Sequence, residues 1–334
     1  MYGLRFLYHK YSFNPKSFVK TKSSRVLSVS KEHCMLKRLN IYFKEMYPIL
    51  PRLALGIMVF LEIYFIVLCN SGITDFNIGI SEIVCGFTIF SFLAWLRIAD
   101  DFKDYELDCR LFAHRPLPSG RVTKKDLKTV LWILIPTTLL LNAIFCWDNF
   151  FFCVFLYTYG SLMAVWFFQK HKIQKSLPMA LVTHNPVQMI MNIYVISFAI
   201  IKYNLPVFTL TNFMAVFTLY FPALIWEVSR KIRAPQDETE YVTYSKLFGY
   251  KKATNFVLVV TLIDIVTNFI LVWNINKWSI LALGILVSWM TYKFIQFKKD
   301  PTQFKLVSVV EKYTYIQETI MILTIVGYLI FGKM

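Results

Sequence analysis

Residues 97–121 read RIADDFKDYELDCRLFAHRPLPSGR, a polar and charged stretch in a chain that is otherwise strongly apolar. Of the 334 residues, 57% are hydrophobic and 17% are charged, whereas a soluble domain has about 45–50% apolar and about 25% charged residues. This composition excludes a soluble enzyme, a disordered chain and a disulfide-stapled secreted domain. The sequence therefore predicts an integral, multi-pass membrane protein in which residues 97–121 form a loop.

Nine apolar runs are long enough to span a bilayer, which takes about 20 residues. Their approximate bounds are 49–69, 78–98, 128–147, 149–169, 179–201, 206–227, 253–273, 278–297 and 314–332. The stretches between them alternate in basic content, with 33 Lys and Arg residues in one set and 3 in the other. Because Lys and Arg favour cytoplasmic loops, we expect the N-terminus inside and the C-terminus outside. The net charge of +16 is then explained by the basic residues of the cytoplasmic loops, and no nucleic-acid partner is expected.

The loop 97–121 begins with a stripe of acidic residues. At about 100° per helical residue, Asp100, Asp101, Asp104 and Asp108 share one narrow helix face, and Glu106 points away. Like charges at this spacing destabilise a helix, and Mg²⁺ relieves such repulsion because it binds oxygen ligands, often shared with substrate phosphates. The spacing favours a metal-binding face over the alternative of a merely polar loop.

A rigid turn follows the acidic stripe. Residues 115–121, RPLPSGR, contain two prolines and a glycine, residues typical of tight turns. Arg115 and Arg121 stand at its two ends, and arginine is well suited to binding phosphate with paired hydrogen bonds. The stripe and the turn together indicate a clamp for a metal ion and a diphosphate.

These two motifs resemble the signature of the UbiA-type intramembrane prenyltransferases. The family motif reads Asn-Asp-x-x-Asp-x-x-x-Asp and continues into Arg-Pro-Leu-x-Ser-Gly, and residues 100–108 (DDFKDYELD) and 115–120 (RPLPSG) are similar to it. Asp100 stands where the family has Asn. The resemblance extends over residues 47–332, including the order of the spans.

The resemblance implies an all-α membrane protein. It is expected to be a bundle of nine transmembrane helices around a central cavity, which opens sideways to lipid and is capped by two acidic cytoplasmic-side loops. Residues 47–334 would form this prenyltransferase domain, and residues 1–46 a basic N-terminal tail.

The second acidic motif of the family has only a partial match here. Glu227 takes the place of its first Asp, and Asp237 and Glu238 lie where its closing acidic pair is found, but an acid between them is missing. Arg230 and Lys231 are additions to the pattern. They are expected either to hold the diphosphate or to form an ordinary surface pair with Glu227.

Polar side chains within the expected spans are a further group of candidates. His184 and Asn185 precede a proline in the fifth span, and Tyr157 lies in the fourth. Polar groups at membrane depth are costly and face a cavity or a partner. His184 and Asn185 would either hold the acceptor or satisfy backbone groups freed by Pro186.

The resemblance implies a reaction and a set of site residues. A polyprenyl diphosphate would be ionised and its prenyl group moved to a lipophilic acceptor, such as a quinone precursor, with Mg²⁺ as cofactor. The expected catalytic and metal-binding residues are Asp100, Asp101, Asp104, Asp108 and Glu227, with Asp237 and Glu238 as further metal ligands. The expected substrate-binding residues are Arg97, Arg115, Lys170, Arg230, Lys231, Tyr157, His184 and Asn185. The alternatives are a terpene cyclase of the same fold, which needs no acceptor, and a non-catalytic transporter or scaffold.

The N-terminal stretch bears on localisation. Residues 1–31 hold seven basic residues and no acidic one. Such a stretch is typical of an organelle transit peptide, of a tail on anionic lipid, or of an extension upstream of a start at Met35. We expect the cell membrane, or an organelle inner membrane if the stretch is a transit peptide.

Overall fold

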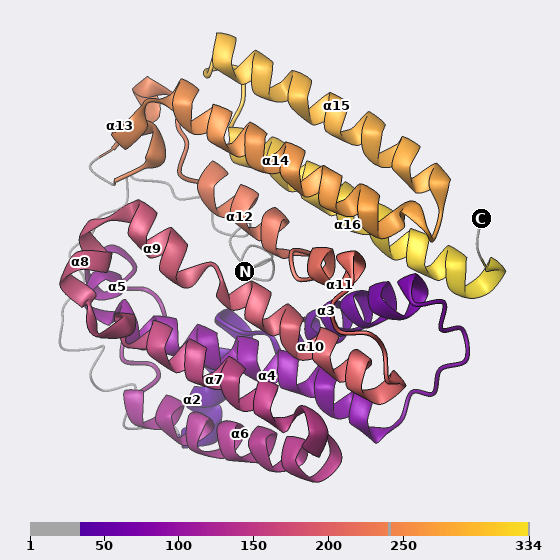
Figure 1. Cartoon of the computed structure of the whole chain (residues 1–334). Helices are drawn as coiled ribbons and strands as arrows, with labels where there is room; N and C mark the ends of the chain where they lie inside the picture. The colour runs from indigo at the N-terminus through magenta and orange to yellow at the C-terminus, as the bar shows by residue number, and fades with distance from the viewer. Residues whose placement is uncertain (1–33, 240–241, 333–334) are drawn as a thin grey trace. The chain divides into compact units, whose positions relative to one another are not determined.

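The computed structural model describes residues 34–239 and 242–332, which contain helices and turns and no strand. The helices, labelled in Figure 1, belong to two compact units, and each unit is considered by itself. The first unit comprises residues 34–60 and 78–167 of the described chain, and the second comprises 61–77 and the described part of 168–332. The basic stretch 1–31 lies outside the described residues.

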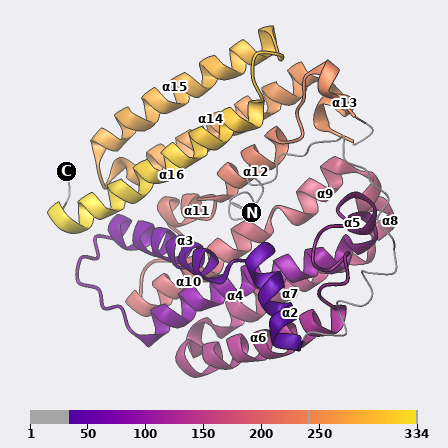
Figure 2. The ribbon, with the colours of Figure 1, turned by 180° about the vertical axis from the view of Figure 1, so that it is seen from behind.

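The first unit is built around helix α4. Its elements are α2 (Met35–Glu45), the first part of α3 (Ile49–Asn70), α4 (Ile80–Lys103), α5 (Tyr105–Leu111), α6 (Lys124–Phe145), η2 (Trp147–Asn149) and α7 (Phe150–Ala164). Helices α6 and α7 pack against α4 and against each other, and α2 lies against α6 (Figure 2). The approach of α7 to α4 is close, because a Cβ atom at Gly160 would lie 2.3 Å from the indole ring of Trp95.

The second unit has its core among its last helices. Its elements are the rest of α3, α8 (Lys170–Lys175), α9 (Leu177–His184), α10 (Val187–Tyr203), α11 (Leu210–Ala215), α12 (Tyr220–Ser229), η4 (Pro235–Asp237), α13 (Tyr244–Phe248), α14 (Tyr250–Trp273), α15 (Lys277–Lys299) and α16 (Leu306–Phe331), with η3 (Trp166–Phe168) at the boundary. Helices α14, α15 and α16 lie side by side. Phe294, Phe297 and Tyr313 are fully buried there.

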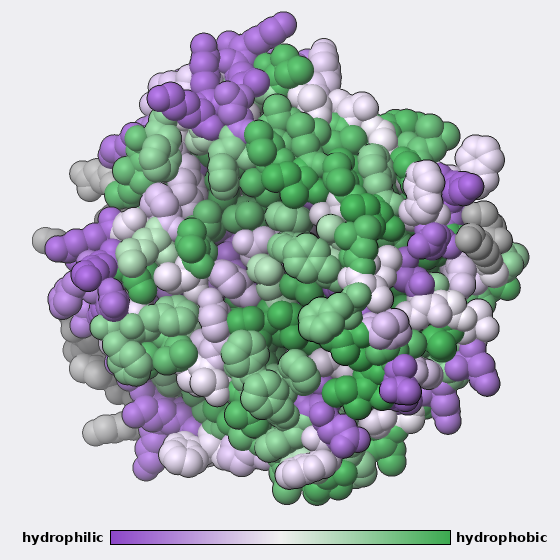
Figure 3. Space-filling view, in the orientation of Figure 1, coloured by the Kyte–Doolittle hydropathy of each residue, from purple (hydrophilic) through white to green (hydrophobic). Residues whose placement is uncertain are grey.

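Large apolar side chains cover the outside of many helices. On α6, Trp132 is 77% exposed, and on α15, Ile285 is 63% exposed. Figure 3 shows a mostly apolar surface along α14 and α15, with hydrophilic residues gathered toward the end that carries α13. Such a surface is suited to lipid rather than water. Eight helical stretches of the described chain are long and apolar enough to cross a membrane, where α9 with α10 and α11 with α12 each count as one stretch. The protein is an integral, multi-pass membrane protein.

The expected count of nine spans is not confirmed. The apolar run 149–169 contains α7, which has 15 residues and ends at Ala164. At 1.5 Å per residue it measures about 22 Å, less than the hydrocarbon thickness of about 30 Å. Three residues with positive φ, Trp166, Phe167 and Phe168, follow it, so the backbone does not continue as a regular helix.

Two other expected spans are interrupted. The run 179–201 is divided into α9 and α10 at Asn185–Pro186, because proline cannot continue the helical hydrogen bonds. The run 206–227 is divided into α11 and α12 near Leu219, which has φ 61°. The central cavity and its two-loop cap stay a prediction.

Candidate active site

The acidic residues 100–108 lie across the junction of α4 and α5. Helix α4 ends at Lys103, and Asp104 has φ −99° and ψ 10°, so the expected continuous helix is broken there. The helical hydrogen bonds nevertheless continue, because the amide of Asp104 donates to Asp100 and that of Asp108 to Asp104, each at 2.9 Å. Asp101 and Asp108 are buried, whereas Glu106 is exposed, as expected from their helix faces.

The two buried aspartates are each paired with an arginine. Arg97 donates from Nη2 to Oδ1 of Asp101 at 2.6 Å, and Arg115 donates from Nη1 to Oδ2 of Asp108 at 2.7 Å. The guanidinium of Arg115 also lies 4.0 Å from the centre of the Phe112 ring. Buried charges are stable only when they are paired in this way. The loop thus brings the predicted acidic and basic residues together.

The other two aspartates are less buried. The ammonium of Lys103 lies 3.2 Å from Oδ1 of Asp100 and 4.6 Å from the centre of the Trp166 ring. Burial raises the pKa of Asp104, and the charges of Asp100 and Asp108 act in the same direction, while Lys103 opposes them. The carboxylates therefore repel one another, which is the condition that a bound cation would relieve.

The turn 115–121 is held by its apolar residue. Leu117 is 5% exposed and belongs to a small core between helices. The buried members of this core are Leu39, Tyr42, Ile98, Leu117, Val122 and Leu127. The amide of Ser119 donates to the carbonyl of Arg115 at 2.9 Å, and Gly120 has φ +75°, which favours glycine. The predicted rigid turn is present, and it fixes Arg115.

Helix α2 adds a contact that the sequence did not predict. The hydroxyl of Tyr42 donates to Oδ2 of Asp101 at 2.6 Å, and both side chains are buried. No residue near the acidic motif in the sequence points to this bond, because the partners are 59 positions apart.

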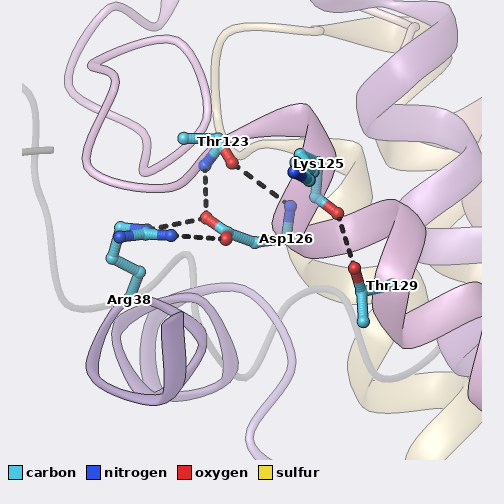
Figure 4. A network of polar contacts seen from close by, with 5 residues as sticks. All are labelled: Arg38, Thr123, Lys125, Asp126 and Thr129. Atoms are coloured by element: carbon cyan, nitrogen blue, oxygen red, sulfur yellow. Dashed lines mark hydrogen bonds and ion pairs between the residues drawn. The ribbon is translucent and has the colours of Figure 1, made fainter. Parts of the chain in front are cut away.

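A second contact of α2 fixes the start of α6. Arg38 donates to both carboxylate oxygens of Asp126, at 2.8 and 2.7 Å (Figure 4). Asp126 also accepts from the amide of Thr123, whose hydroxyl accepts from the amide of Asp126. This reciprocal arrangement is a capping box. The Thr-x-x-Asp spacing was visible in the sequence and could have located the start of this helix.

The second acidic motif also contains a buried carboxylate with cationic partners. Glu227, near the end of α12, is 6% exposed. Arg230 donates to its two oxygens at 2.6 and 2.8 Å, and the ammonium of Lys231 lies 2.9 Å from Oε1. The lysine side chain is 12% exposed. The Glu–Lys pair thus lies inside the protein, unlike the surface pair considered from the sequence.

Glu238 is engaged in the structure of its own loop. Thr243 donates to Oε2 of Glu238 at 2.7 Å, and the hydroxyl of Ser245 donates to Oε1. Asp237 is exposed in the short helix η4. The described contacts do not bring either acid to Glu227, and both carboxylates stay predicted metal ligands.

The other candidate substrate-binding residues differ in their neighbours and in their exposure. In the second unit, Nδ1 of His184 lies 2.9 Å from the hydroxyl of Thr183. Asn185 is 5% exposed and lies at the break between α9 and α10. Lys170 is exposed at the start of α8.

Tyr157 lies in the core of the first unit. Its hydroxyl is 3.0 Å from that of Ser91, and its ring contacts Phe92 and Trp95, with centroids 5.3 and 5.8 Å away. These neighbours are on α4, so Tyr157 joins α7 to α4.

The acidic residues are not gathered around one point. Within residues 34–239 and 242–332, no three His, Cys, Asp or Glu side chains are arranged to hold a metal ion. The donor chemistry nevertheless fits Mg²⁺, because it consists of carboxylate oxygens. Asp101, Asp108 and Glu227 are instead paired with cationic side chains. A metal ion would have to exchange with these partners.

Comparisons with known proteins bear on the fold. No known protein family matches the sequence, and no curated protein matches it. The structure is similar to a solved structure of a digeranylgeranylglyceryl phosphate synthase, with a TM-score of 0.60. The two chains are 16% identical, and the similarity covers 88% of this chain and 99% of the other. The chain therefore shares the fold of this membrane synthase, which agrees with the resemblance noted for residues 100–120.

Proposed function

We propose that the protein is a Mg²⁺-dependent intramembrane prenyltransferase, which moves a polyprenyl group from its diphosphate to a lipophilic acceptor, such as a quinone precursor. The observation that carries this proposal is the pairing of buried carboxylates with arginines in residues 97–121. A diphosphate and its metal ion need these two kinds of group side by side. A transporter or scaffold has no evident need for them.

The paired charges offer a simple way to bind the substrate. Arg97 and Arg115 would turn from the aspartates to the diphosphate oxygens, for which arginine is well suited. Asp101 and Asp108 would then be released from their arginines and, with Asp100 and Asp104, would hold the metal. Bound Mg²⁺ supplies positive charge that stabilises the departing diphosphate. The exchange keeps every charge compensated throughout.

The second motif would contribute in the same manner. Arg230 and Lys231 would bind the leaving diphosphate, and Glu227 would be released as a metal ligand. The apolar residues of the spans would keep water from the allylic cation. Aromatic ring faces would stabilise its charge. His184, Asn185 and Tyr157 remain candidates for the acceptor, and Lys170 for the diphosphate.

The membrane orientation can be tested first. Reporter fusions near residues 112 and 240 should both read as cytoplasmic, because the basic loops favour that side. Fusions near residues 75 and 275 should read as external. If residues 112 and 240 lie on opposite sides of the membrane, the two motifs cannot act on the same diphosphate. The membrane itself is proposed to be the cell membrane, or an organelle inner membrane if residues 1–31 are a transit peptide.

The reaction is tested with the purified full-length protein. Geranylgeranyl diphosphate or longer homologues are incubated with Mg²⁺, with and without a membrane lipid extract, and products are identified by mass spectrometry. A prenylated adduct that requires the extract supports the transferase. A hydrocarbon formed without the extract indicates the terpene cyclase. No Mg²⁺-dependent release of diphosphate under either condition contradicts both.

A further inference from the structure

The carboxylate of Asp101 is held from two sides. Arg97, from the same helix, donates to Oδ1 at 2.6 Å, and Tyr42, from α2, donates to Oδ2 at 2.6 Å. Asp101 is 4% exposed and Tyr42 is fully buried. With one donor on each oxygen and little free space, the carboxylate has a fixed orientation.

Tyr42 is well suited to hold this carboxylate without blocking it. The phenol hydroxyl of tyrosine is a hydrogen-bond donor, and that of Tyr42 donates to Oδ2 of Asp101. A carboxylate oxygen has two lone pairs, so Oδ2 can accept from Tyr42 and still bind a cation. When Arg97 turns to a diphosphate, Tyr42 would remain to orient Asp101.

Helix α2 contacts the segment between the end of α4 and the start of α6 at three places. Tyr42 contacts Asp101 at the end of α4. Arg38 binds Asp126 at the start of α6 (Figure 4), and Glu45 binds Arg121 at the end of the turn. The loop that carries the first acidic motif is thus tied to α2 near its beginning, near the end of its turn and where it enters α6.

The apolar face of α2 reinforces these bonds. Leu39 and Tyr42 are buried in the small core that also holds Leu117 of the turn. On the opposite side of the helix, Lys37 and Lys44 are exposed. The helix is therefore amphipathic, and its apolar side packs in the core that holds Leu117 of the turn.

We propose, on the basis of the proposed function, that Tyr42 is a positioning residue for Asp101 and that α2 holds the first acidic motif in place. The segment before the first span would then be part of the catalytic apparatus and not merely a basic tail. Tyr42 would act through Asp101 and would not touch the prenyl diphosphate.

The test compares two tyrosine variants of the full-length protein. Tyr42→Phe removes the hydroxyl that binds Asp101. Tyr47→Phe is the matched control, because Tyr47 is also buried in the first unit but donates to the backbone carbonyl of Phe90 at 2.9 Å. We expect Tyr42→Phe to lower kcat by about ten- to hundredfold, the scale of one lost charge-assisted hydrogen bond. The KM for the prenyl diphosphate should change by less than about threefold, because the diphosphate contacts remain.

A binding measurement provides a readout besides turnover. Mn²⁺ is used as the probe, and its binding is counted by electron paramagnetic resonance in the presence of a non-ionisable thiolo analogue of geranylgeranyl diphosphate. Tyr42→Phe should weaken Mn²⁺ binding by about three- to tenfold, whereas Tyr47→Phe should leave it unchanged. Thermal unfolding of both variants is measured alongside.

The attachment of α2 to the start of α6 is tested with Arg38→Lys, which keeps the charge but loses the double hydrogen bond to Asp126. It should lower kcat less than Tyr42→Phe does, and the double variant should be little worse than Tyr42→Phe alone, because both act through one contact. The proposal is overturned if Tyr42→Phe keeps full kcat and Mn²⁺ binding, or if both tyrosine variants lose kcat only in step with Tm. If the wild-type protein releases no diphosphate, the proposed function fails first, and the positioning role fails with it.

Discussion

The two acidic segments reach a similar arrangement by different routes. In residues 97–121, Asp101 receives one donor from its own helix and one from α2, and Asp108 receives Arg115 from the turn. In the second unit, Glu227 receives both of its cationic partners from the next turn of the same chain segment. The first arrangement depends on tertiary structure, and the second depends largely on helix geometry. A buried carboxylate can therefore be compensated either locally or by distant segments, and only the local case can be predicted from spacing.

The largest effect is expected in the first segment. Asp104→Ala and Asp108→Ala should abolish Mg²⁺-dependent turnover, because each removes a carboxylate from the face that would hold the metal. Glu106→Ala is the control, since Glu106 is exposed in the same segment. Diphosphate release by the purified variants is the measurement. Equal losses in Glu106→Ala and Asp104→Ala would mean that the stripe merely keeps the loop soluble.

A smaller effect is expected in the second segment. Arg230→Gln or Lys231→Gln should lower kcat/KM by about ten- to hundredfold and raise the KM for the prenyl diphosphate, because each removes one charge-assisted bond to the leaving group. Adding Ala234→Asp should not restore activity, since it supplies a carboxylate and no cation. Initial rates at varied diphosphate concentration give both constants. Full activity in both single variants would leave the pair with only its structural bond to Glu227.

The smallest effect concerns the packing that supports the first unit. Gly160→Ala should lower stability by about 1–3 kcal/mol, the usual range for overpacking, because its new Cβ would overlap the ring of Trp95. Gly284→Ala on α15 is the control, since a Cβ atom added there would meet no other atom within 4 Å. Thermal unfolding in detergent distinguishes the two. An unchanged Tm for Gly160→Ala would show that α7 is free to move away from α4.

Much of the fold follows from short-range patterns in the sequence. Apolar runs predicted the long helices, and the prolines and glycine of residues 115–120 predicted the turn. The approach of Arg230 and Lys231 to Glu227 followed from helical spacing. Each of these features depends on residues within about one helical length of one another.

The features that were missed depend on packing between distant segments. The bond from Tyr42 to Asp101 joins residues 59 positions apart, and nothing in the local pattern around Tyr42 marks it. The positive φ of Leu219 is not predicted either, because leucine rarely adopts it. The break in the acidic helix at Asp104 likewise has no proline or glycine to announce it.

The internal pairing of charges has a consequence for membrane insertion and folding, which precede substrate binding. Because Asp101, Asp108 and Glu227 are compensated by side chains of the chain itself, we expect the protein to insert into the bilayer and fold without divalent ions. Protein produced in the presence of a chelator should therefore accumulate in its mature form. Its activity should then appear as soon as Mg²⁺ is added, with no lag for refolding.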